Sequence, residues 1–188
     1  MALLKIARMG NPVLKAIAEP VEDPTAWEIT KLVSDMIETM NDANGTGLAA
    51  PQVHVSKRVV VFYVDGGRDA REGGDGEGVP LTIMVNPEIE PLSDEKEMGW
   101  EGCLSLPSMM GLVPRFTHIR YVAYDIKGKR FEREAMGFHA RVVQHECDHL
   151  NGMLYPQRIE DMNTFGFNDE VLRAQSEEQE FLDDQDGE

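Results

Sequence analysis

The segment QHECDHLNG at residues 144–152 constrains the fold of this chain more than any other stretch. It holds two of the five histidines, His145 and His149, with Glu146 directly after the first. On an α-helix, side chains four residues apart lie on one face, so the two imidazoles would point the same way with Glu146 beside them. This HExxH pattern is typical of metal-dependent hydrolases, in which the histidines bind the metal and the glutamate is the general base. We therefore predict a metal-binding helix over residues 137–152.

A catalytic metal site of this kind needs a third protein ligand, and the sequence offers more than one candidate. In one class of HExxH proteins, a glycine and then a third histidine follow the second histidine. Gly152 is in place here, but Tyr155 stands where that histidine would be. In another class, a glutamate roughly 20 residues downstream completes the site, and Glu170 lies at about that distance. Cys103, in EGCLSLP (101–107), is a further candidate, because thiolate is an excellent ligand for zinc or iron.

The two cysteines of the chain, Cys103 and Cys147, are not expected to form a disulfide. Nothing in the sequence indicates secretion, and disulfides are rare in cytosolic proteins. On the predicted helix, Cys147 would point almost opposite to the two histidines. Of the two cysteines, Cys103 is therefore the candidate ligand, with a buried apolar role as the simpler alternative.

The charge of the chain is strongly negative and unevenly distributed. The formal net charge is −16, which argues against a general nucleic-acid-binding protein, because contact with phosphates needs a basic surface. Residues 161–188 hold ten acidic residues and one arginine, so we expect an acidic C-terminal helix or tail after a single domain over residues 1–160. No stretch approaches the roughly 18 consecutive apolar residues of a membrane-spanning helix, so no membrane partner is expected.

The hydrophobic pattern predicts an α+β fold. Residues 24–44 place apolar side chains at helical spacing, which predicts a long N-terminal amphipathic helix. Residues 65–78 are rich in glycine and charge and predict a flexible surface loop. Short antiparallel strand pairs with one helix before and one after favour strands packed around the central HExxH helix over alternating βαβ units. Runs of β-branched and aromatic residues predict strands over residues 58–64, 81–89, 118–126 and 131–136.

The stretch GTGLAAPQ at residues 45–52 combines small residues with one polar side chain. Its glycines and alanines let a ligand or a neighbouring strand approach the backbone closely, and Gln52 offers an amide N–H at the edge. A simpler alternative is that Gly45 and Gly47 only end the preceding helix and begin a loop.

Three separated motifs, taken together, resemble the signature motifs of the peptide deformylase family: GTGLAAPQ (45–52), EGCLSLP (101–107) and QHECDHLNG (144–152). The segments GNPVLKAIAEPV, VNPEI and LVPR add to a resemblance that covers roughly residues 3–160. Three motifs in the same order are far more specific than HExxH alone. The resemblance implies that residues 1–160 are a peptide deformylase catalytic domain.

The resemblance implies that Cys103, His145 and His149 bind one divalent metal ion and that Glu146 is the general acid/base. The native ion would be Fe²⁺, with Zn²⁺, Ni²⁺ or Co²⁺ able to substitute. The implied reaction removes the N-formyl group from the N-terminal formyl-methionine of newly made proteins, releasing formate. The alternative drawn from the residues alone is a zinc endopeptidase with Glu170 as the third ligand.

The resemblance also assigns supporting roles. Gln52 and the backbone N–H of Leu104 would stabilise the oxyanion, and an ion pair of Glu101 and Arg115 would support the loop that carries Cys103. Next to the histidines on the predicted helix, an apolar pair would either wall a methionine pocket or only pack in the core. This apolar pair is Phe138 and Val142. The full set of residues expected to contact substrate is Thr46, Gly47, Glu101, Gly102, Phe138 and Val142.

The implied partners are N-formyl-methionyl nascent peptides in the cytoplasm. The C-terminal helix of the family can be basic and touch the ribosome. Residues 161–188 are acidic here, which disfavours that contact. Neither nucleic acid nor membrane is expected to bind directly.

Overall fold

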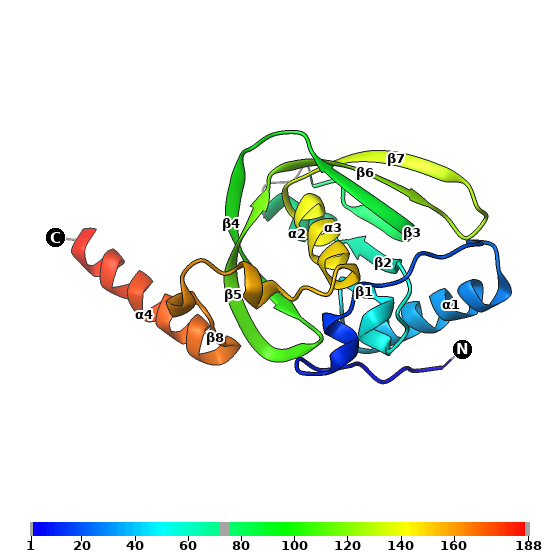
Figure 1. The fold of residues 1–188 in the computed structure, drawn as a ribbon. Coiled ribbons are helices and arrows are strands. Elements are labelled where there is room, and N and C mark those ends of the chain that lie inside the picture. The colour runs from blue at the N-terminus through cyan, green and yellow to red at the C-terminus, as the bar shows by residue number, and fades with distance from the viewer. Residues whose placement is uncertain (1, 72–75, 187–188) are drawn as a thin grey trace.

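The computed structural model describes residues 2–71 and 76–186, whose strands form two antiparallel sheets. Helix α3 (Gly137–Leu150) contacts strands of both sheets (Figure 1). This arrangement confirms the predicted mixture of helices with antiparallel strands. The five-stranded sheet, in the order β1-β2-β3-β6-β7, comprises Gly47–Ala49, Val59–Val64, Val79–Pro91, His118–Tyr124 and Arg130–Met136. The three-stranded sheet, in the order β4-β5-β8, comprises Lys96–Cys103, Leu106–Phe116 and Gly166–Phe167.

Three further α-helices complete the fold. Helix α1 (Trp27–Asp42) lies within the range predicted for the N-terminal helix, and α4 (Asn168–Asp186) projects from the body of the protein (Figure 1). Helix α2 (Gly66–Arg71) is short. Among the described residues, no helix combines the length and apolar character needed to cross a membrane. Short 3₁₀ turns lie at Pro12–Lys15, Ala50–Val53, Tyr155–Arg158 and Met162–Thr164.

Strand β2 is apolar at nearly every position because both of its faces are covered. Side chains alternate between the two faces of a strand. Val60 and Phe62 belong to the hydrophobic cluster that includes side chains of α3. Val59 and Val61 belong to a second cluster, with Met40 of α1. The sheet is thus sandwiched between α3 and α1, and a continuous apolar run is what such a strand requires.

The prediction of a loop over residues 65–78 is wrong for residues 66–71, which form α2. Asp65 caps the start of this helix. Its side-chain Oδ1 and its backbone carbonyl oxygen each accept the backbone N–H of Arg68 at 3.1 Å. Helix α2 contacts α3. Glycine-rich composition hid this helix because glycine has low helix propensity, whereas capping and tertiary contact stabilise it. Residues 72–75 of the predicted loop lie outside the described residues.

The β4–β5 pair lies outside the strands that were predicted. Glycine and proline recur through both strands, at Gly99, Gly111, Pro107 and Pro114 among others, and interrupt the β-branched pattern that identifies strands. The two strands nevertheless pair continuously from Lys96↔Phe116 to Gly102↔Met110. This hairpin carries Cys103 to the metal-binding helix.

The N-terminal segment crosses the end of α3, and Gly152 makes this crossing possible. The Ala18 N–H donates to the Leu150 carbonyl at 2.8 Å. Gly152 has a φ of +72°, and a Cβ at this position would lie 2.5 Å from the Lys15 carbonyl oxygen. The two backbones therefore approach too closely for any side chain.

We expect Gly152→Ala to lower the free energy of unfolding by about 3 kcal/mol or more, because overlap with Lys15 adds to the cost of a positive φ. Gly10→Ala is the matched control. Gly10 has a φ of +103°, but no described atom lies within 4 Å of an added Cβ, so only strain of about 1–2 kcal/mol is expected. Chemical denaturation measures both values. Equal losses would show that the contact with Lys15 imposes no constraint.

Candidate metal centre

Three potential metal ligands converge from elements far apart in the sequence. Cys103 ends β4, and His145 and His149 lie one turn apart on α3. Their donor atoms all lie within 4.8 Å of one another, and Cys103 Sγ is 3.3 Å from His149 Nε2. Donors that share a metal at bond lengths of about 2.0–2.3 Å and tetrahedral angles stand about 3.5 Å apart. The thiol and two imidazoles therefore fit a transition metal such as zinc or iron.

A shift in the strand register turns Cys103 toward α3. Gly102 pairs with Met110, but Cys103 pairs with Leu106, so the pairing is irregular between Gly102 and Cys103. Such an irregularity changes the direction in which a side chain points. As a result, the sulfur faces the metal-binding helix at the point where the strand ends.

Glu101 fixes the orientation of His145. Its Oε2 accepts a hydrogen bond from His145 Nδ1 at 2.8 Å, which leaves the Nε2 lone pair available to a metal. Burial alone would raise the pKa of Glu101, but hydrogen bonds from Arg115 and His145 outweigh it and hold this pKa well below its usual value. Burial lowers the pKa of His149 well below its usual value, which keeps that imidazole neutral and able to bind a metal.

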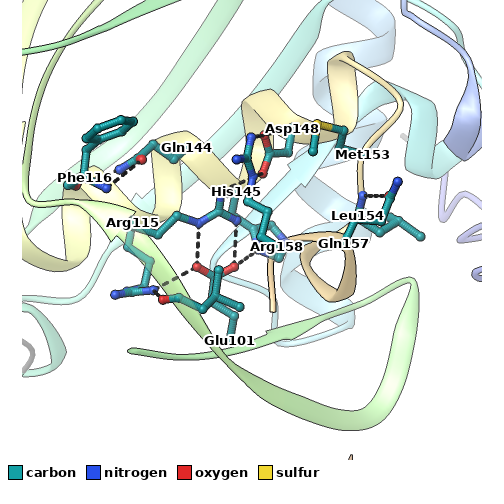
Figure 2. Close-up of polar contacts among 12 residues, drawn as sticks. Glu101, Arg115, Phe116, Gln144, His145, Asp148, Met153, Leu154, Gln157 and Arg158 are labelled. Carbon is teal, nitrogen blue, oxygen red and sulfur yellow. Dashed lines mark hydrogen bonds and ion pairs between the residues drawn. The ribbon is translucent and has the colours of Figure 1, made fainter. Parts of the chain in front are cut away.

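A network of buried ion pairs joins the β4–β5 hairpin to α3 (Figure 2). Arg115 donates to both Glu101 oxygens, at 2.8 and 2.9 Å, and to Asp148 at 2.6 Å. Arg141 donates to Glu101 at 3.0 Å and to backbone carbonyls of β4 and β5. Arg158, whose side chain is 38% exposed, also pairs with Asp148. The structure has the Glu101–Arg115 pair that the resemblance implied, whereas Arg141, Asp148 and Arg158 were missed.

A sequence signal for these missed residues existed. Arg141 and Asp148 lie on the helix that was predicted to be central, and buried charges need partners. A second missed anchor is Gln144, whose side-chain amide exchanges two hydrogen bonds with the Phe116 backbone, at 3.1 and 2.9 Å. Polar residues on a central helix therefore indicated contacts with another element, although not which one.

Glu146 occupies space that only a glycine at position 47 leaves open. A Cβ on Gly47 would lie 2.3 Å from Glu146 Oε1. Glu146 is 5% exposed, and this burial raises its pKa to about 7. Its Oε2 has no hydrogen-bond partner among the described residues. A carboxyl group in this state can both accept and release a proton near neutral pH.

Gln52 directs its side-chain amide N–H toward the ligand cluster. Its Oε1 accepts the Ala49 N–H at 2.8 Å, which identifies the other end of the amide as the donor. Its Nε2 lies 3.5 Å from Cys103 Sγ and 3.2 Å from Ser105 Oγ. Gln52 therefore presents a fixed donor beside the ligand cluster, which is the placement that stabilisation of an oxyanion requires.

These groups surround one cavity of about 450 Å³, which we call the catalytic cavity. His149 is the exception among the predicted site residues, since it is only 1% exposed and does not line this space. Phe138 and Val142 are both on the cavity wall and in the hydrophobic core, so the two alternatives considered for them are compatible. The predicted residues on the wall are Thr46, Gly47, Gln52, Glu101, Gly102, Cys103, Leu104, Phe138, Val142, His145 and Glu146.

Glu170 does not belong to the ligand cluster. It lies on α4, where its side chain is exposed and pairs with Arg173. The alternative of an endopeptidase with Glu170 as the third metal ligand is therefore wrong. Cys147 is also separate from the cluster: it is buried in the core, where burial raises its pKa to about 12, and both cysteines are free.

Comparisons with known proteins identify relatives of one kind. The model of the polypeptide deformylase family matches residues 3–165. Peptide deformylase 1 of Bordetella pertussis is 57% identical over 167 residues, which are 89% of this chain and 93% of that protein. Peptide deformylase 1 of Nitrosomonas europaea is 47% identical over 91% of this chain and 96% of its own. A class I type b peptide deformylase structure from Acinetobacter baumannii matches with a TM-score of 0.78 and 39% identity, covering 85% of this chain and all of that one.

We expect Cys103→Ala to weaken metal binding at least about 100-fold, because it removes one of three ligands. Cys147→Ala is the matched control and should keep its metal, since Cys147 lies in the core away from the cluster. Elemental analysis of both purified variants, together with metal titration of the apo-proteins, measures the difference. A metal-replete Cys103→Ala variant would contradict the assignment of the third ligand.

Proposed function

Because this chain belongs to the polypeptide deformylase family, we propose that the catalytic cavity is where it removes the formyl group of an N-formyl-methionyl peptide. The chain is a metal-dependent hydrolase that acts on formylated nascent peptides, as this family does. The observation that carries the assignment to this cavity is the convergence of Cys103, His145 and His149 beside the buried Glu146.

We infer that the three converging side chains hold the metal. Their mutual distances and the hydrogen bond between His145 and Glu101 support this inference. A divalent metal held by Cys103, His145 and His149 would supply Lewis-acid chemistry, the activation of water near neutral pH and the polarisation of a carbonyl group. Glu101 keeps the ring of His145 in the orientation that binding requires, and Arg115 and Arg141 hold Glu101.

Glu146 carries the proton in this proposal. The oxygen of water adds to the formyl carbon, and a proton of that water passes to a carboxylate oxygen of Glu146. The same carboxyl group then gives the proton to the amine nitrogen as the carbon–nitrogen bond breaks. Formate leaves, and the peptide keeps a free N-terminal methionine.

Gln52 Nε2 and the backbone N–H of Leu104 stabilise the oxygen charge that develops on the formyl group. Fixed donors are worth more in a cavity shielded from water than in solution, because they need no reorganisation during the reaction. The hydrogen bond from the Ala49 N–H to Gln52 Oε1 keeps the Gln52 side-chain amide in the required orientation.

The substrate methionine lies against Phe138 and Val142, two buried apolar side chains on the cavity wall. Burial of a methionine side chain contributes roughly 1.5–3 kcal/mol to binding. Thr46, Gly47 and Gly102 line the same cavity and contact the substrate backbone. A related structure from Acinetobacter baumannii is described as bound to Met-Ala-Ser, which begins with an unformylated methionine and so has the chemistry of a product.

We propose residues 1–160 as the catalytic domain, with the acidic segment 161–188 as an appendage. The substrate of the protein is a nascent peptide, so we infer that the protein acts in the cytoplasm, where translation takes place. Within that segment, β8 pairs with β5, while α4 carries acidic residues along its length. This charge disfavours docking on the phosphate-rich ribosome surface.

We expect Glu146→Ala to retain metal yet lose about 10²-fold or more in turnover, the usual contribution of a general acid/base. The assay measures formate release from formyl-Met-Ala-Ser beside an internally quenched endopeptidase substrate, which should remain uncut. Glu170→Ala is the control and should match the wild-type protein in metal content and turnover. Turnover of Glu146→Ala near that of the wild-type protein would show that another group moves the proton.

We propose Fe²⁺ as the native metal, on the resemblance to the family. Zinc generally binds such sites more tightly than Fe²⁺, so affinity alone does not select iron. Iron held by Cys103, His145 and His149 would supply the same Lewis-acid chemistry as zinc, with a less restricted number of ligands. The thiolate of Cys103 suits either ion.

Apo-protein reconstituted with iron without oxygen should release formate much faster than the zinc form. The iron form should lose activity in air, because Fe²⁺ is oxidised and the Cys103 thiolate can then be oxidised as well. Nickel or cobalt should give a stable, active protein. Formate release is measured for each ion before and after aerobic incubation. Zinc activity equal to that of iron, together with no effect of air, would contradict the assignment of iron.

A further inference from the structure

Helix α2 brings one arginine to the edge of the catalytic cavity. Arg68 is half-buried, and its guanidinium carbon lies 4.1 Å from the centre of the Phe138 ring. Phe138 is itself a wall of that cavity. Helix α2 contacts α3, and its buried Asp69 accepts the Gly76 N–H at 3.1 Å. Stacking on an aromatic face orients the planar guanidinium and leaves N–H donors around its edge.

Arg68 lies where the catalytic cavity meets a second hollow of about 520 Å³. Arg68, Trp100 and Asn168 line both spaces. The second hollow opens outward, since Met98 and Leu172 on its wall are 43% and 52% exposed. An extended peptide advances about 3.3 Å per residue, so a peptide that leaves the catalytic cavity past Arg68 would bring the residues directly after a bound methionine to this junction.

We propose that Arg68 is a specificity-determining residue that binds a carboxylate side chain at the second or third position of the peptide substrate. This inference rests on the proposed function, because it requires formyl-methionine to occupy the catalytic cavity. A carboxylate and a guanidinium form charge-assisted hydrogen bonds, which are stronger than neutral ones and depend on direction. Peptides with Asp or Glu after methionine are therefore preferred over peptides with Lys or Arg there.

The other charged groups that line the junction are either paired with each other or negatively charged, so they are not suited to bind a substrate carboxylate. Glu101 and Arg141 line both spaces, but they bond to each other at 3.0 Å. Arg115 lines the second hollow but is bonded to Glu101 and Asp148. Glu97 on the same wall opposes a carboxylate, so the favourable contact has to come from Arg68. A guanidinium has five N–H donors, so it can keep a neighbour in the protein and still bind a substrate.

Apart from Glu97, most of the negative charge of the chain, −16 in total, opposes an acidic peptide from a distance. Charges farther away than the Debye length, about 8 Å at physiological salt, are largely screened. Contact with Arg68 is direct, so it decides the preference for one peptide over another. The preference should weaken as salt is raised, because the junction is partly open to solvent.

The test compares the wild-type protein with Arg68→Met, which keeps a flexible apolar side chain over Phe138 but removes the charge. The substrates are formyl-Met-Ala-Ser, formyl-Met-Glu-Glu and formyl-Met-Lys-Lys, each amidated at its C-terminus so that no terminal carboxylate competes. Formate release gives kcat and KM for each peptide. Arg71→Ala is the matched control, because Arg71 is exposed on the same helix and lines neither space.

We expect the wild-type protein to favour the Glu peptide over the Lys peptide. Arg68→Met should lower kcat/KM for the Glu peptide about five-fold, mainly through KM, and change the neutral peptide less than about two-fold. Arg68→Glu should reverse the preference, and Arg71→Ala should leave every ratio unchanged.

Equal losses on all three peptides would overturn the proposal, because they would show that Arg68 only supports the packing of Phe138. Unchanged ratios in Arg68→Met and Arg68→Glu would overturn it as well. Failure of the wild-type protein to release formate from the neutral peptide would instead contradict the proposed function, so the two failures are distinguishable.

Discussion

The buried carboxylate of Glu101 is the interaction on which the rest of the site depends. Moving such an ion into a protein interior costs several kcal/mol, and only well-placed partners offset that cost. Arg115, Arg141 and His145 all donate to it. Because Glu101 lies on β4 and its partners lie on β5 and α3, satisfying this one charge fixes the hairpin against the helix. The same carboxylate orients a metal ligand, so the fold and the site share one constraint.

Helix α3 differs from an ordinary amphipathic helix because both of its faces are buried. A surface helix turns its polar side to water. Here Phe138 and Leu150 pack in the core cluster of the five-stranded sheet, while Arg141 and His145 bond to Glu101 on the hairpin. The polar face must therefore find its partners inside the protein. This requirement is why ion pairs join the two sheets across the helix, in addition to the apolar packing of Phe116 against the core cluster.

Local pattern was enough to predict the elements whose hydrophobic period is uninterrupted. The apolar spacing of residues 24–44 and the β-branched run at 58–64 correspond to α1 and β2, since helix and strand periods determine which side chains share a face. Helix α2 and the β4–β5 hairpin escaped prediction. Their glycines and prolines are unfavourable in isolation, and contacts with α3 and between distant strands stabilise them.

The sequence by itself determined that His145, Glu146 and His149 share one region of a helix, because spacing along a helix fixes direction. It left the third ligand open between Cys103 and Glu170, and only resemblance to a family favoured the cysteine. Tertiary structure alone decided that Cys103 Sγ lies 3.3 Å from His149, with Glu170 exposed on α4. It also decided that Arg68 stands at the cavity edge. Distances between remote segments arise from the packing of the whole chain, which no local pattern encodes.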